Sequence, residues 1–588
     1  MRAVHVALVL ACCGLSKGLL EVFQAAPPPR STLEEPACRQ LLFEHDYGNS
    51  YEAPYVGAYS PPSGCNFTTA IFNLSVISSG RQYDRLATLW LGDVEVWRTS
   101  TAMPTQSGIH WSFQKDMTIW HRLLMQDQKI IFDLGNLIDG DRYTGFFNVT
   151  MEALYYDDEY KAGFHPADGI YAISTLSSPS NTTSLFSLPG DSGSVNIILP
   201  RNVRNAVVSV MASGNGAEEF WFTNVPTEYV NTFPGNEGWL YPYSPFREVQ
   251  LLIDGQLAGV SWPFPILFTG GVDPGAWRPI IGIDAFELPS SEIDITPWLG
   301  LLTDGQEHTF QLRVVSFDTF AEGIGPVGEN WWVSGSIFVW LDDAVEQMVS
   351  QNFSSEVTAP FFDFRPVVGT AIAGNGSATN TSFYFSLTAS RNITISSTII
   401  SGNSTRQAAW TQSLTFSNIQ NMTDLAFNQS LAMVTSGSYS DSASDVISHY
   451  TYPLNLFSAY DVAFSGATTN PGSVLCLADR SKLIDGISTL SFLTGTSVET
   501  ASLKTRQNVT SNYHWNRTIV EGTPGLDTMD GEVWLSYSGS AASEGGVIAY
   551  HRYAKEKNDS VLIDEEGWEQ MPVPSTVPLP VVEGEPEV

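Results

Sequence analysis

Acidic side chains stand at three points where the sequence is otherwise apolar or aromatic. Asp84 lies in "QYDRLATLW", Glu152 in "NVTMEALYY", and Glu218 and Glu219 in "GNGAEEFWFTNVP". A strand acid is most often a solvated surface residue, but one that stays among apolar neighbours tends to have a partner. Converging acids can hydrolyse a bond, because an ionised one activates water and a protonated one serves the leaving group. The pattern therefore predicts a hydrolytic site built from carboxyl groups.

Other catalytic motifs have no support. "GDSGS" at 190–194 resembles the serine loop of trypsin-like proteases, but it lies in a Ser-rich stretch and no matching histidine segment accompanies it. There is no H-E-x-x-H, C-x-x-C or P-loop motif, so a zinc enzyme or an NTPase is not indicated. "SGNG" at 213–216 does not complete a dinucleotide-binding motif and is expected to be a tight turn. We expect neither a metal nor a cofactor.

The charge of the chain argues against nucleic acid as a partner. Lys and Arg number 28 and Asp and Glu 62, so the formal charge is −34, and phosphates would be repelled. The same charge fits an acidic working environment, or solubility alone. Charged residues are only 15% of the chain, against a typical value of about 25%, so uncharged polar residues must carry the surface.

The N-terminus, "MRAVHVALVLACCGLSKG" (1–18), has a basic residue, an apolar run and then small residues. This order is typical of a secretory signal peptide, and the run is too short to span a bilayer. No later stretch approaches about 18 uninterrupted apolar residues. The mature protein is expected to be extracellular or in a vacuolar lumen, without a membrane span.

N-glycosylation sequons fit this route, and they are densest between 352 and 428. They begin at Asn66, Asn73, Asn148, Asn181, Asn352, Asn375, Asn380, Asn392, Asn403, Asn421, Asn428, Asn508, Asn516 and Asn558. Without the signal peptide three cysteines remain. Cys38 and Cys65 are near enough in sequence to form a disulfide worth roughly 3–4 kcal/mol. Cys476 is left over and is expected to be a buried, inert thiol.

Most of the chain consists of short runs rich in Val, Ile, Thr and aromatics, separated by Gly, Pro, Asn and Asp, which is typical of antiparallel β-sandwiches. Hairpins are predicted over 86–97, around Gly92-Asp93, and over 248–260, around Asp254-Gly255. One short helix is predicted over 342–351. Composition divides the chain into a first domain at 36–176, a second at 195–350 and a β-rich C-terminal domain at 367–560. The segments 177–194 and 350–366 are expected to be linkers, and the Pro-rich acidic tail 571–588 is expected to be disordered.

Four blocks in the expected order resemble the peptide N-glycanase A family, amidases of plants and fungi that detach N-linked glycans from asparagine. The blocks are "YDRLATLWLGDVEVWRTSTAMPT", "GIHWSFQKDMTIWHRLL", "EEFWFTNVP" and "LLIDGQLAGVSWPFPILFTGGVDPGAWRPI". The resemblance implies an all-β fold of two adjacent antiparallel jelly-roll sandwiches followed by a further β-rich domain. It also implies hydrolysis of the GlcNAc–asparagine amide bond of N-glycopeptides or unfolded glycoproteins, which converts Asn to Asp.

A more distant resemblance, to the bacterial peptide N-glycosidase F, assigns roles. Asp84 matches the catalytic acid of an aromatic-Asp-Arg-x-Ala segment, and Glu152, 19 residues after Asp133, matches the second acid. Glu219 matches the third acid better than Glu218, which stays an alternative. Leu154 stands where the bacterial enzyme has a tryptophan, so at least one sugar contact is not carried over.

These matches imply that Asp84 activates water while Glu219 positions water or donates a proton. Arg85 is expected to control the charge of a nearby acid, with Glu152 as its candidate partner. Candidate sugar-binding rings are Trp111, Trp221 and Trp262. Two alternatives stay open from the residues alone, a two-carboxylate glycoside hydrolase and a non-catalytic carbohydrate-binding protein.

Overall fold

The computed structural model describes residues 18–25, 35–140, 142–157, 165–233, 240–372, 374, 376–402, 404–441, 446–462, 472–486, 498–515, 528–541 and 547–567. In this part of the chain the secondary structure is almost entirely antiparallel strand, and the all-β prediction is confirmed. The α-helices described there, α1 (His121–Leu124) and α2 (Leu299–Leu302), are single turns, and neither is long enough to cross a bilayer. The tail 571–588 and, apart from residue 18, the expected signal peptide lie outside the described residues.

The first sandwich packs a five-stranded sheet against a four-stranded one. In spatial order the first sheet is β1 (Leu20–Glu21), β7 (Ile109–Asp116), β4 (Thr69–Ser79), β9 (Phe146–Tyr156) and β2 (Cys38–Tyr47). The second sheet is β3 (Tyr55–Tyr59), β8 (Gln128–Leu134), β5 (Leu86–Leu91) and β6 (Val94–Ser100). Inward-facing side chains such as Phe72, Leu89 and Met151 are fully buried between the sheets, as alternation along amphipathic strands requires.

The second sandwich begins earlier than composition suggested. One of its sheets has the order β10 (Gly169–Ile173), β19 (Trp331–Leu341), β13 (Val203–Gly214) and β16 (Ser291–Asp294), with β11 (Phe186–Leu188) paired to β19. The other has the order β12 (Ser194–Ile197), β17 (His308–Asp318), β14 (Glu248–Ile253) and β15 (Gln256–Ser261), with β18 (Gly323–Gly325) paired to β17. Because β10 and β11 both pair with β19, residues 169–188 are part of this sandwich. The junction with the first sandwich therefore falls between β9 and β10.

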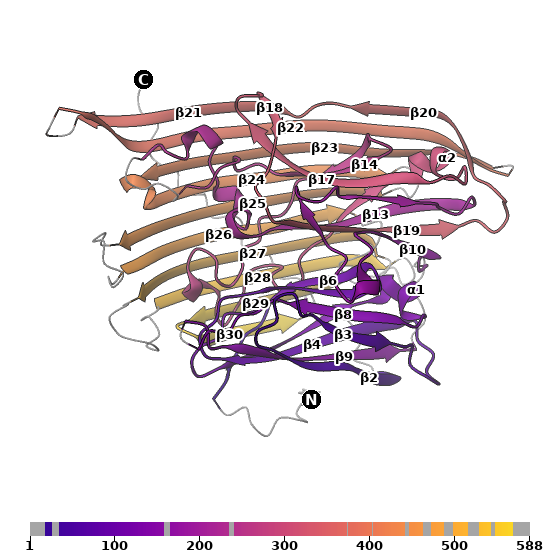
Figure 1. The fold of residues 1–588 in the computed structure, drawn as a ribbon, viewed down its shortest axis with the longest axis horizontal. Helices are drawn as coiled ribbons and strands as arrows, with labels where there is room; N and C mark the ends of the chain where they lie inside the picture. The colour runs from indigo at the N-terminus through magenta and orange to yellow at the C-terminus, as the bar shows by residue number, and fades with distance from the viewer. Residues whose placement is uncertain are drawn as a thin grey trace.

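The C-terminal part forms one long antiparallel sheet that lies behind both sandwiches (Figure 1). Its strands are β20 (Val349–Val357), β21 (Phe361–Ile372), β22 (Ala378–Ser401), β23 (Ser404–Thr423), β24 (Asn428–Asp441), β25 (Val446–Val462), β26 (Gly472–Gly486), β27 (Val498–Trp515), β28 (Thr528–Ala541), β29 (Val547–Lys557) and β30 (Ser560–Gly567). The sheet shares its core with the second sandwich: Phe246 packs against Phe416 at 5.3 Å between ring centres. Strands β20 and β21 occupy most of the expected linker at 350–366.

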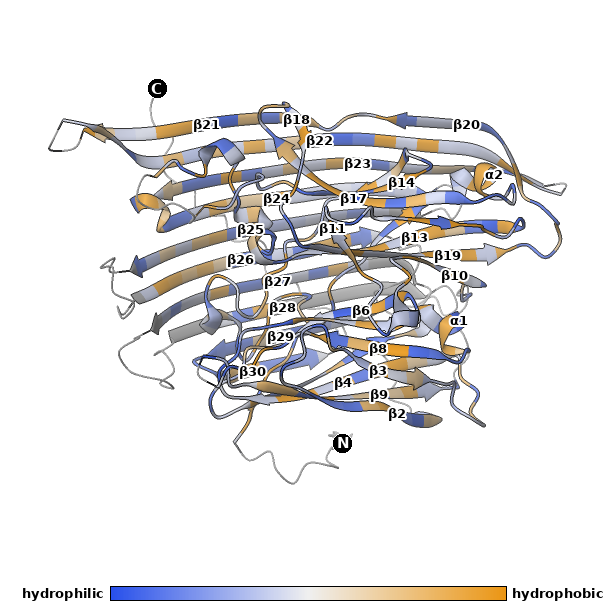
Figure 2. Cartoon of the chain, viewed as in Figure 1, coloured by the Kyte–Doolittle hydropathy of each residue, from blue (hydrophilic) through white to orange (hydrophobic). Residues whose placement is uncertain are grey.

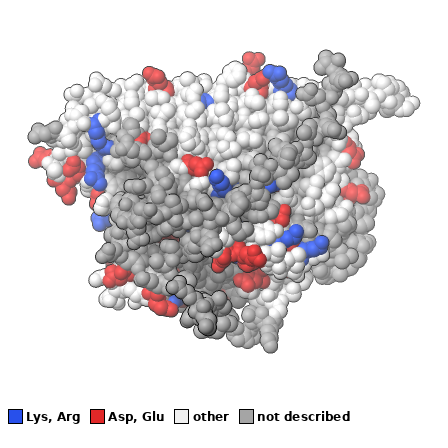
Figure 3. All heavy atoms as spheres, turned by 180° about the vertical axis from the view of Figure 1, so that it is seen from behind, with Lys and Arg blue, Asp and Glu red and all other residues white. Residues whose placement is uncertain are grey.

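Hydropathy along the strands explains this layering. Apolar and polar residues alternate along the strands of the long sheet (Figure 2), and β23 alternates between buried and less buried positions over most of its length. The alternation gives the sheet an apolar face for the sandwiches and a polar face for solvent. On the face of the molecule seen in Figure 3, charged side chains are sparse among the described residues, as the low charged fraction predicted.

Local predictions can be checked one by one. Both hairpins are confirmed, and left-handed φ angles of 60° at Gly92, 48° at Asp254 and 78° at Gly255 set their turns. The Cys38–Cys65 disulfide is present and Cys476 is a buried free thiol. The helix predicted over 342–351 is wrong. The Asp342 side chain accepts the Ala344 N–H in a local turn, and β20 begins at residue 349.

Candidate active site

Asp84 lies just before β5, where the first sandwich meets the second. It is half-buried, and its carboxyl group accepts hydrogen bonds from its own N–H and from the N–H of Gly270. Gly270 belongs to the long loop between β15 and β16. Burial raises the pKa of Asp84 to about 6, although both hydrogen bonds and the charge of Arg85 oppose the shift. The group therefore stays ionised at neutral pH and gains a proton in mild acid.

Two glycines let the β15–β16 loop approach the site this closely. A Cβ atom on Gly270 would lie 2.0 Å from Oδ1 of Asp84, and one on Gly271 would lie 2.7 Å from the ring of Phe220. Thr269 fixes the loop, because its hydroxyl donates to the carbonyl of Thr101 at 3.0 Å and accepts from the N–H of Met103 at 3.1 Å. The sequence analysis included this loop in a family-like block but missed its contact with Asp84. The local signal for that contact was the Gly-Gly pair in "LFTGGVDPG".

Glu219 follows a short 3-10 helix of the second sandwich (Gly216–Glu218). Burial, and then the nearby negative charge of Asp84, raise the pKa of Glu219 to about 8. The two acids thus come from different sandwiches and sense each other's charge. Because their pKa values are pushed apart, one can hold a proton while the other is ionised, which is the condition for general acid–base chemistry.

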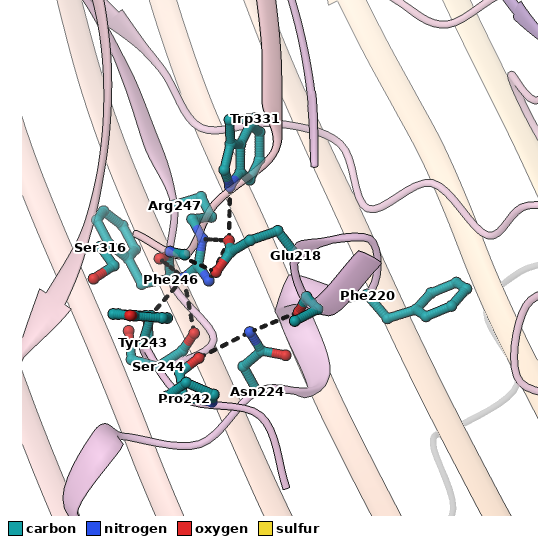
Figure 4. Close-up of polar contacts among 12 residues, drawn as sticks. Glu218, Phe220, Asn224, Pro242, Tyr243, Ser244, Phe246, Arg247, Ser316 and Trp331 are labelled. Atoms are coloured by element: carbon teal, nitrogen blue, oxygen red, sulfur yellow. Dashed lines mark hydrogen bonds and ion pairs between the residues drawn. The ribbon is translucent and has the colours of Figure 1, made fainter. Parts of the chain in front are cut away.

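Glu218 occupies a different environment from its neighbour. It is completely buried, and its carboxylate accepts from Arg247 Nε at 2.7 Å, from the indole N–H of Trp331 at 2.6 Å and from the N–H of Gly328 at 3.0 Å. Figure 4 shows Glu218 between Arg247 and Trp331, while Phe220 points away from them. Because these three donors hold both carboxylate oxygens of Glu218, the arrangement favours a structural role for Glu218 and leaves Glu219 to face Asp84.

The "SGNG" turn leads from β13 into the 3-10 helix that carries Glu218 and is followed by Glu219. Gly216 has a left-handed φ of 59°, and a Cβ on Gly214 would lie only 2.1 Å from the carbonyl oxygen of Glu218. A chain without these glycines could not fold back this tightly after β13. The prediction that this segment is a tight turn is confirmed. Successive residues of a 3-10 turn point about 120° apart, which sends Glu218 inward and Glu219 toward Asp84.

Arg85 is held in place by uncharged partners. Its Nη2 donates to Gln82 Oε1 at 2.7 Å and its Nε to Asn136 Oδ1 at 3.3 Å, and its guanidinium lies 5.8 Å from the ring centre of Tyr51. In the described part of the chain it forms no ion pair with Glu152. The charge of Arg85 acts instead on Asp84, where it lowers the pKa against the larger effect of burial.

Glu152 lies on β9, in the sheet that does not carry Asp84. It is half-buried and stands opposite Asn73 of β4, while its neighbours Met151 and Ala153 fill the core of the first sandwich. Glu152 therefore projects from the outer face of that sheet. The structure brings together Asp84, Arg85 and Glu219, but it does not bring Glu152 to them.

Asp133 is a carboxyl group that sequence reasoning used only as a spacing marker. It lies on β8 directly opposite Thr88 of β5, so it projects from the same face of the sheet as Thr88. It is half-buried, and burial raises its pKa to about 6. No ion pair of Asp133 occurs among the described residues. Because Leu86 packs toward the β15–β16 loop, this face of the sheet is the one that meets the second sandwich.

The aromatic side chains near Asp84 are tyrosines rather than the expected tryptophans. Trp111, Trp221 and Trp262 are at most 5% exposed, and Trp111 stacks on Phe286 inside the core. Their burial favours packing over sugar stacking. Tyr83, in contrast, is 53% exposed, and Tyr51 is 57% exposed. Both adjoin the Asp84–Arg85 pair, and the sequence signal for Tyr83 was its place in the aromatic-Asp-Arg segment. Where the structure is described, no three metal-binding side chains converge.

Comparison with known proteins identifies a family for this chain. Residues 26–358 match the family model described as peptide N-acetyl-beta-D-glucosaminyl asparaginase amidase A, and residues 384–454 match the C-terminal domain of the same enzymes. A relative from Prunus dulcis, peptide-N4-(N-acetyl-beta-glucosaminyl)asparagine amidase A, is 31% identical over 468 residues, which are 75% of this chain and 77% of the relative. A solved structure of PNGF-II in space group C2 overlaps at 13% identity with a TM-score of 0.34, over 55% of this chain and 65%, just under two thirds, of that one.

The expected family resemblance is thus confirmed. The family model covers more than half of the chain, and the Prunus dulcis relative matches three quarters of it. The residues that match the family model include Asp84, Glu219 and the β15–β16 loop, so the match covers both sandwiches. This chain belongs to the peptide N-acetyl-beta-D-glucosaminyl asparaginase amidase A family.

Proposed function

We propose that this chain hydrolyses the amide bond between GlcNAc and asparagine in N-glycopeptides, with Asp84 and Glu219 as its acid–base pair. Family membership supports the amidase activity. One observation supports the residue roles: two acids from different sandwiches meet, with pKa values of about 6 and about 8. Between those values Asp84 is ionised and Glu219 is protonated, and amide hydrolysis needs a base and an acid in these states.

The proposed reaction uses each group once. The Asp84 carboxylate takes a proton from water as the water oxygen bonds to the side-chain carbonyl carbon of the substrate asparagine. The carbonyl electrons move to its oxygen, and a tetrahedral intermediate forms. When it collapses, the carbon–nitrogen bond breaks and Glu219 gives its proton to the departing nitrogen. The products are an aspartate side chain and a free glycosylamine, so the substrate loses its glycan and gains a carboxyl group.

Tyr83 and Tyr51 are the proposed sugar contacts. Their exposed rings adjoin Asp84 and Arg85, and Tyr83 lies 5.8 Å from the ring of Tyr143. An aromatic face packs against the C–H face of a pyranose ring and excludes water from the bond to be cut. Asp133 of β8 projects from the face of its sheet that meets the second sandwich. We assign to it the role of third acid of the site, which was first expected for Glu152.

A purified N-glycopeptide tests the function directly. An amidase leaves a peptide that contains aspartate, about one mass unit heavier than the unglycosylated asparagine peptide. A glycoside hydrolase leaves one GlcNAc on the peptide, and a binding protein leaves the glycopeptide intact. Mass spectrometry of the peptide product therefore separates the three classes. Asp84→Asn should abolish release while the melting temperature stays unchanged, and full activity in that variant would refute the role of Asp84.

An extracellular or vacuolar location is the second part of the proposal. The eleven sequon asparagines that the structure describes are all exposed or half-buried, and a disulfide joins Cys38 to Cys65. Both features suit a secretory, oxidising compartment. Expression of the whole chain in plant cells, followed by fractionation and treatment with an endoglycosidase, tests this: a cytosolic protein without a mobility shift would overturn it.

A further inference from the structure

A cavity of about 240 Å³ lies where the two sandwiches meet the long C-terminal sheet. The first sandwich contributes Lys115 and Trp120, the second sandwich and its β15–β16 loop contribute residues of 260–292, and strands β23 to β27 form the remaining wall. The rim includes half-buried residues such as Ser290, Glu292 and Tyr439, so the cavity opens to solvent. No residue of the Asp84–Glu219 pair lines it.

Aromatic rings form much of the wall. Tyr450 and Tyr452 are stacked at 4.8 Å between ring centres, with 24° between their planes. Phe264 meets Tyr452 edge-on at 5.1 Å, and Trp262 also lines the cavity, with its indole N–H bonded to Glu248. Such walls suit a ligand with one apolar face rather than a fully hydrated ion.

One buried polar group of the lining has no partner in the part of the chain that the structure describes, and two tyrosine hydroxyl groups stand beside it in the wall. The indole N–H of Trp120 is buried and unpaired, although Trp120 is only 2% exposed. Tyr450 and Tyr452 are half-buried in the same wall, and burial raises the pKa of both hydroxyl groups. A buried Trp donor is normally satisfied. The cavity therefore offers hydrogen-bonding capacity that a ligand rich in hydroxyl groups would use.

The charges around the cavity are nearly balanced. Lys115 is paired with Glu287, and Lys482 Nζ lies 2.6 Å from Asp284 Oδ2. Glu292 adds one further acid at the rim. A lining that pairs its own lysines with its own carboxylates offers no strong attraction to either a cation or an anion. The carboxylates still have lone pairs that accept from neutral O–H donors.

The volume limits the size of the ligand. Sites for drug-sized ligands occupy roughly 300–1,000 Å³, so 240 Å³ accommodates one ring and not an oligosaccharide. We propose that this cavity binds a single uncharged sugar ring. Its aromatic walls receive the C–H face of the ring, and Trp120, Tyr450, Tyr452, Asp284 and Glu287 bind its hydroxyl groups. The site goes beyond the proposed amidase function, because binding requires no bond cleavage.

The β15–β16 loop connects this site to the acid pair. Phe264 and Ile266 line the cavity, and Gly270, four residues further along, donates its N–H to Asp84. The sugar could come from two sources, a branch of the bound N-glycan or a free saccharide. Both present the same ring chemistry, and the experiment distinguishes them.

The test uses the full-length Asp84→Asn protein, in which cleavage is blocked, so that failure of the amidase proposal does not affect it. Saturation-transfer NMR with GlcNAc, mannose, galactose and fucose, each alone, should show saturable binding of at least one of them. Ala212→Phe, which places a ring inside the cavity, should weaken that binding about tenfold or more. Tyr452→Phe removes one hydroxyl group and should weaken it roughly two- to tenfold.

Matched controls separate binding from folding. Ala321→Phe and Tyr241→Phe change the same residue types at exposed positions outside the cavity and should bind as the parent does, with all melting temperatures compared. The KM of Ala212→Phe is then measured in the wild-type background with a branched glycopeptide and with a glycopeptide that carries GlcNAc alone. If KM rises only for the branched substrate, the bound sugar is a branch of the substrate. If KM is unchanged for both, the bound sugar is a free saccharide. Absence of binding by all four sugars, or binding that Ala212→Phe and Tyr452→Phe leave unchanged, overturns the proposal.

Discussion

The backbone N–H of Gly270 donates a hydrogen bond to the carboxyl group of Asp84, although 186 residues separate them in the sequence. This contact joins the two sandwiches at the acid pair. A Cβ on residue 270 would lie 2.0 Å from Oδ1 of Asp84, so only glycine permits the approach. The loop therefore positions the proposed base directly, and Thr269, bonded to both Thr101 and Met103, holds the loop in register.

Gly270→Ala should lower kcat/KM by about 100-fold, because displacing a catalytic group by about 1 Å costs that much. Steady-state kinetics on an N-glycopeptide measure the loss. The matched control is Gly323→Ala, since an added Cβ there meets nothing nearer than 3.6 Å and φ is not left-handed, and it should retain full activity. Equal activity of the two variants would mean that Gly270 does not position Asp84.

Sequence alone could predict the elements that depend on local pattern. The hairpin at 86–97 follows from alternating residues around Gly92, whose left-handed φ suits its turn. The Cys38–Cys65 pairing follows from there being few candidates. Asp84 was identified because an acid among apolar residues is unusual and because its segment matched a known motif. These features need no knowledge of distant contacts.

The remaining features depend on long-range packing. The proposed choice of Glu219 over Glu218 depends on Arg247 and Trp331, both far away in sequence, which bond to Glu218. The burial of Trp262 depends on the C-terminal sheet, because the centre of its ring lies 6.4 Å from that of Phe416. Periodicity within a strand could not test the expected Arg85–Glu152 pair. Glu152 lies on β9 of one sheet, whereas Arg85 directly precedes β5 of the other.

The two adjacent glutamates should separate in function and stability. Glu219→Gln removes the proposed proton donor and should lower kcat by roughly 10²–10⁴-fold without loss of stability. Glu218→Gln removes the charge that balances the buried Arg247 and should destabilise the fold by roughly 3 kcal/mol. Activity assays and urea unfolding of both variants give the four values needed. A stable Glu218→Gln protein without activity, beside an active Glu219→Gln protein, would reverse the assignment.

The pH dependence of kcat/KM should be bell-shaped. Lowering the pH through about 6 protonates Asp84 and removes the base, and raising it through about 8 deprotonates Glu219 and removes the acid. Rates measured from pH 4 to pH 10 should therefore fall on both sides of a maximum between these values. The residual activity of Glu219→Gln should keep the acid limb and lose the alkaline one. An alkaline limb that survives this substitution would assign that limb to another group.

The same proton should appear in the stability of the fold. Native Glu219 keeps its proton up to about pH 8, whereas the unfolded chain releases it near the ordinary value of 4.5. A raised carboxyl pKa stabilises the fold fully below 4.5, and this contribution is lost as the pH rises toward 8. Melting temperatures should thus fall between pH 4.5 and pH 8, and less steeply for Glu219→Gln. An identical slope in both proteins would show that the native and unfolded pKa values of Glu219 do not differ.

A second pair of acids joins the second sandwich to the long sheet. Asp294 of β16 and Asp441 of β24 are each 1% exposed, and the two carboxyl groups lie close enough that Asp441 favours the protonated form of Asp294. Burial, and then the charge of Asp441, raise the pKa of Asp294. Thr296 donates its N–H to Asp294 Oδ1 at 2.8 Å, and the charges of both acids act on the nearby guanidinium of Arg406.

Asp294→Asn should make the stability of the fold less sensitive to a rise in pH from 5 to 8. The amide oxygen can accept from the N–H of Thr296 as the carboxyl group does, and its N–H₂ can donate to Asp441 without a bound proton. Because the wild-type pair must keep a proton that the unfolded chain has released, its stabilisation fades as the pH rises. Calorimetry at pH 5 and pH 8 should show a smaller decrease in melting temperature for Asp294→Asn, whereas Asp461→Asn, at an exposed position, should behave as wild type. A parallel decrease in all three proteins would mean that the carboxyl pair holds no proton at neutral pH.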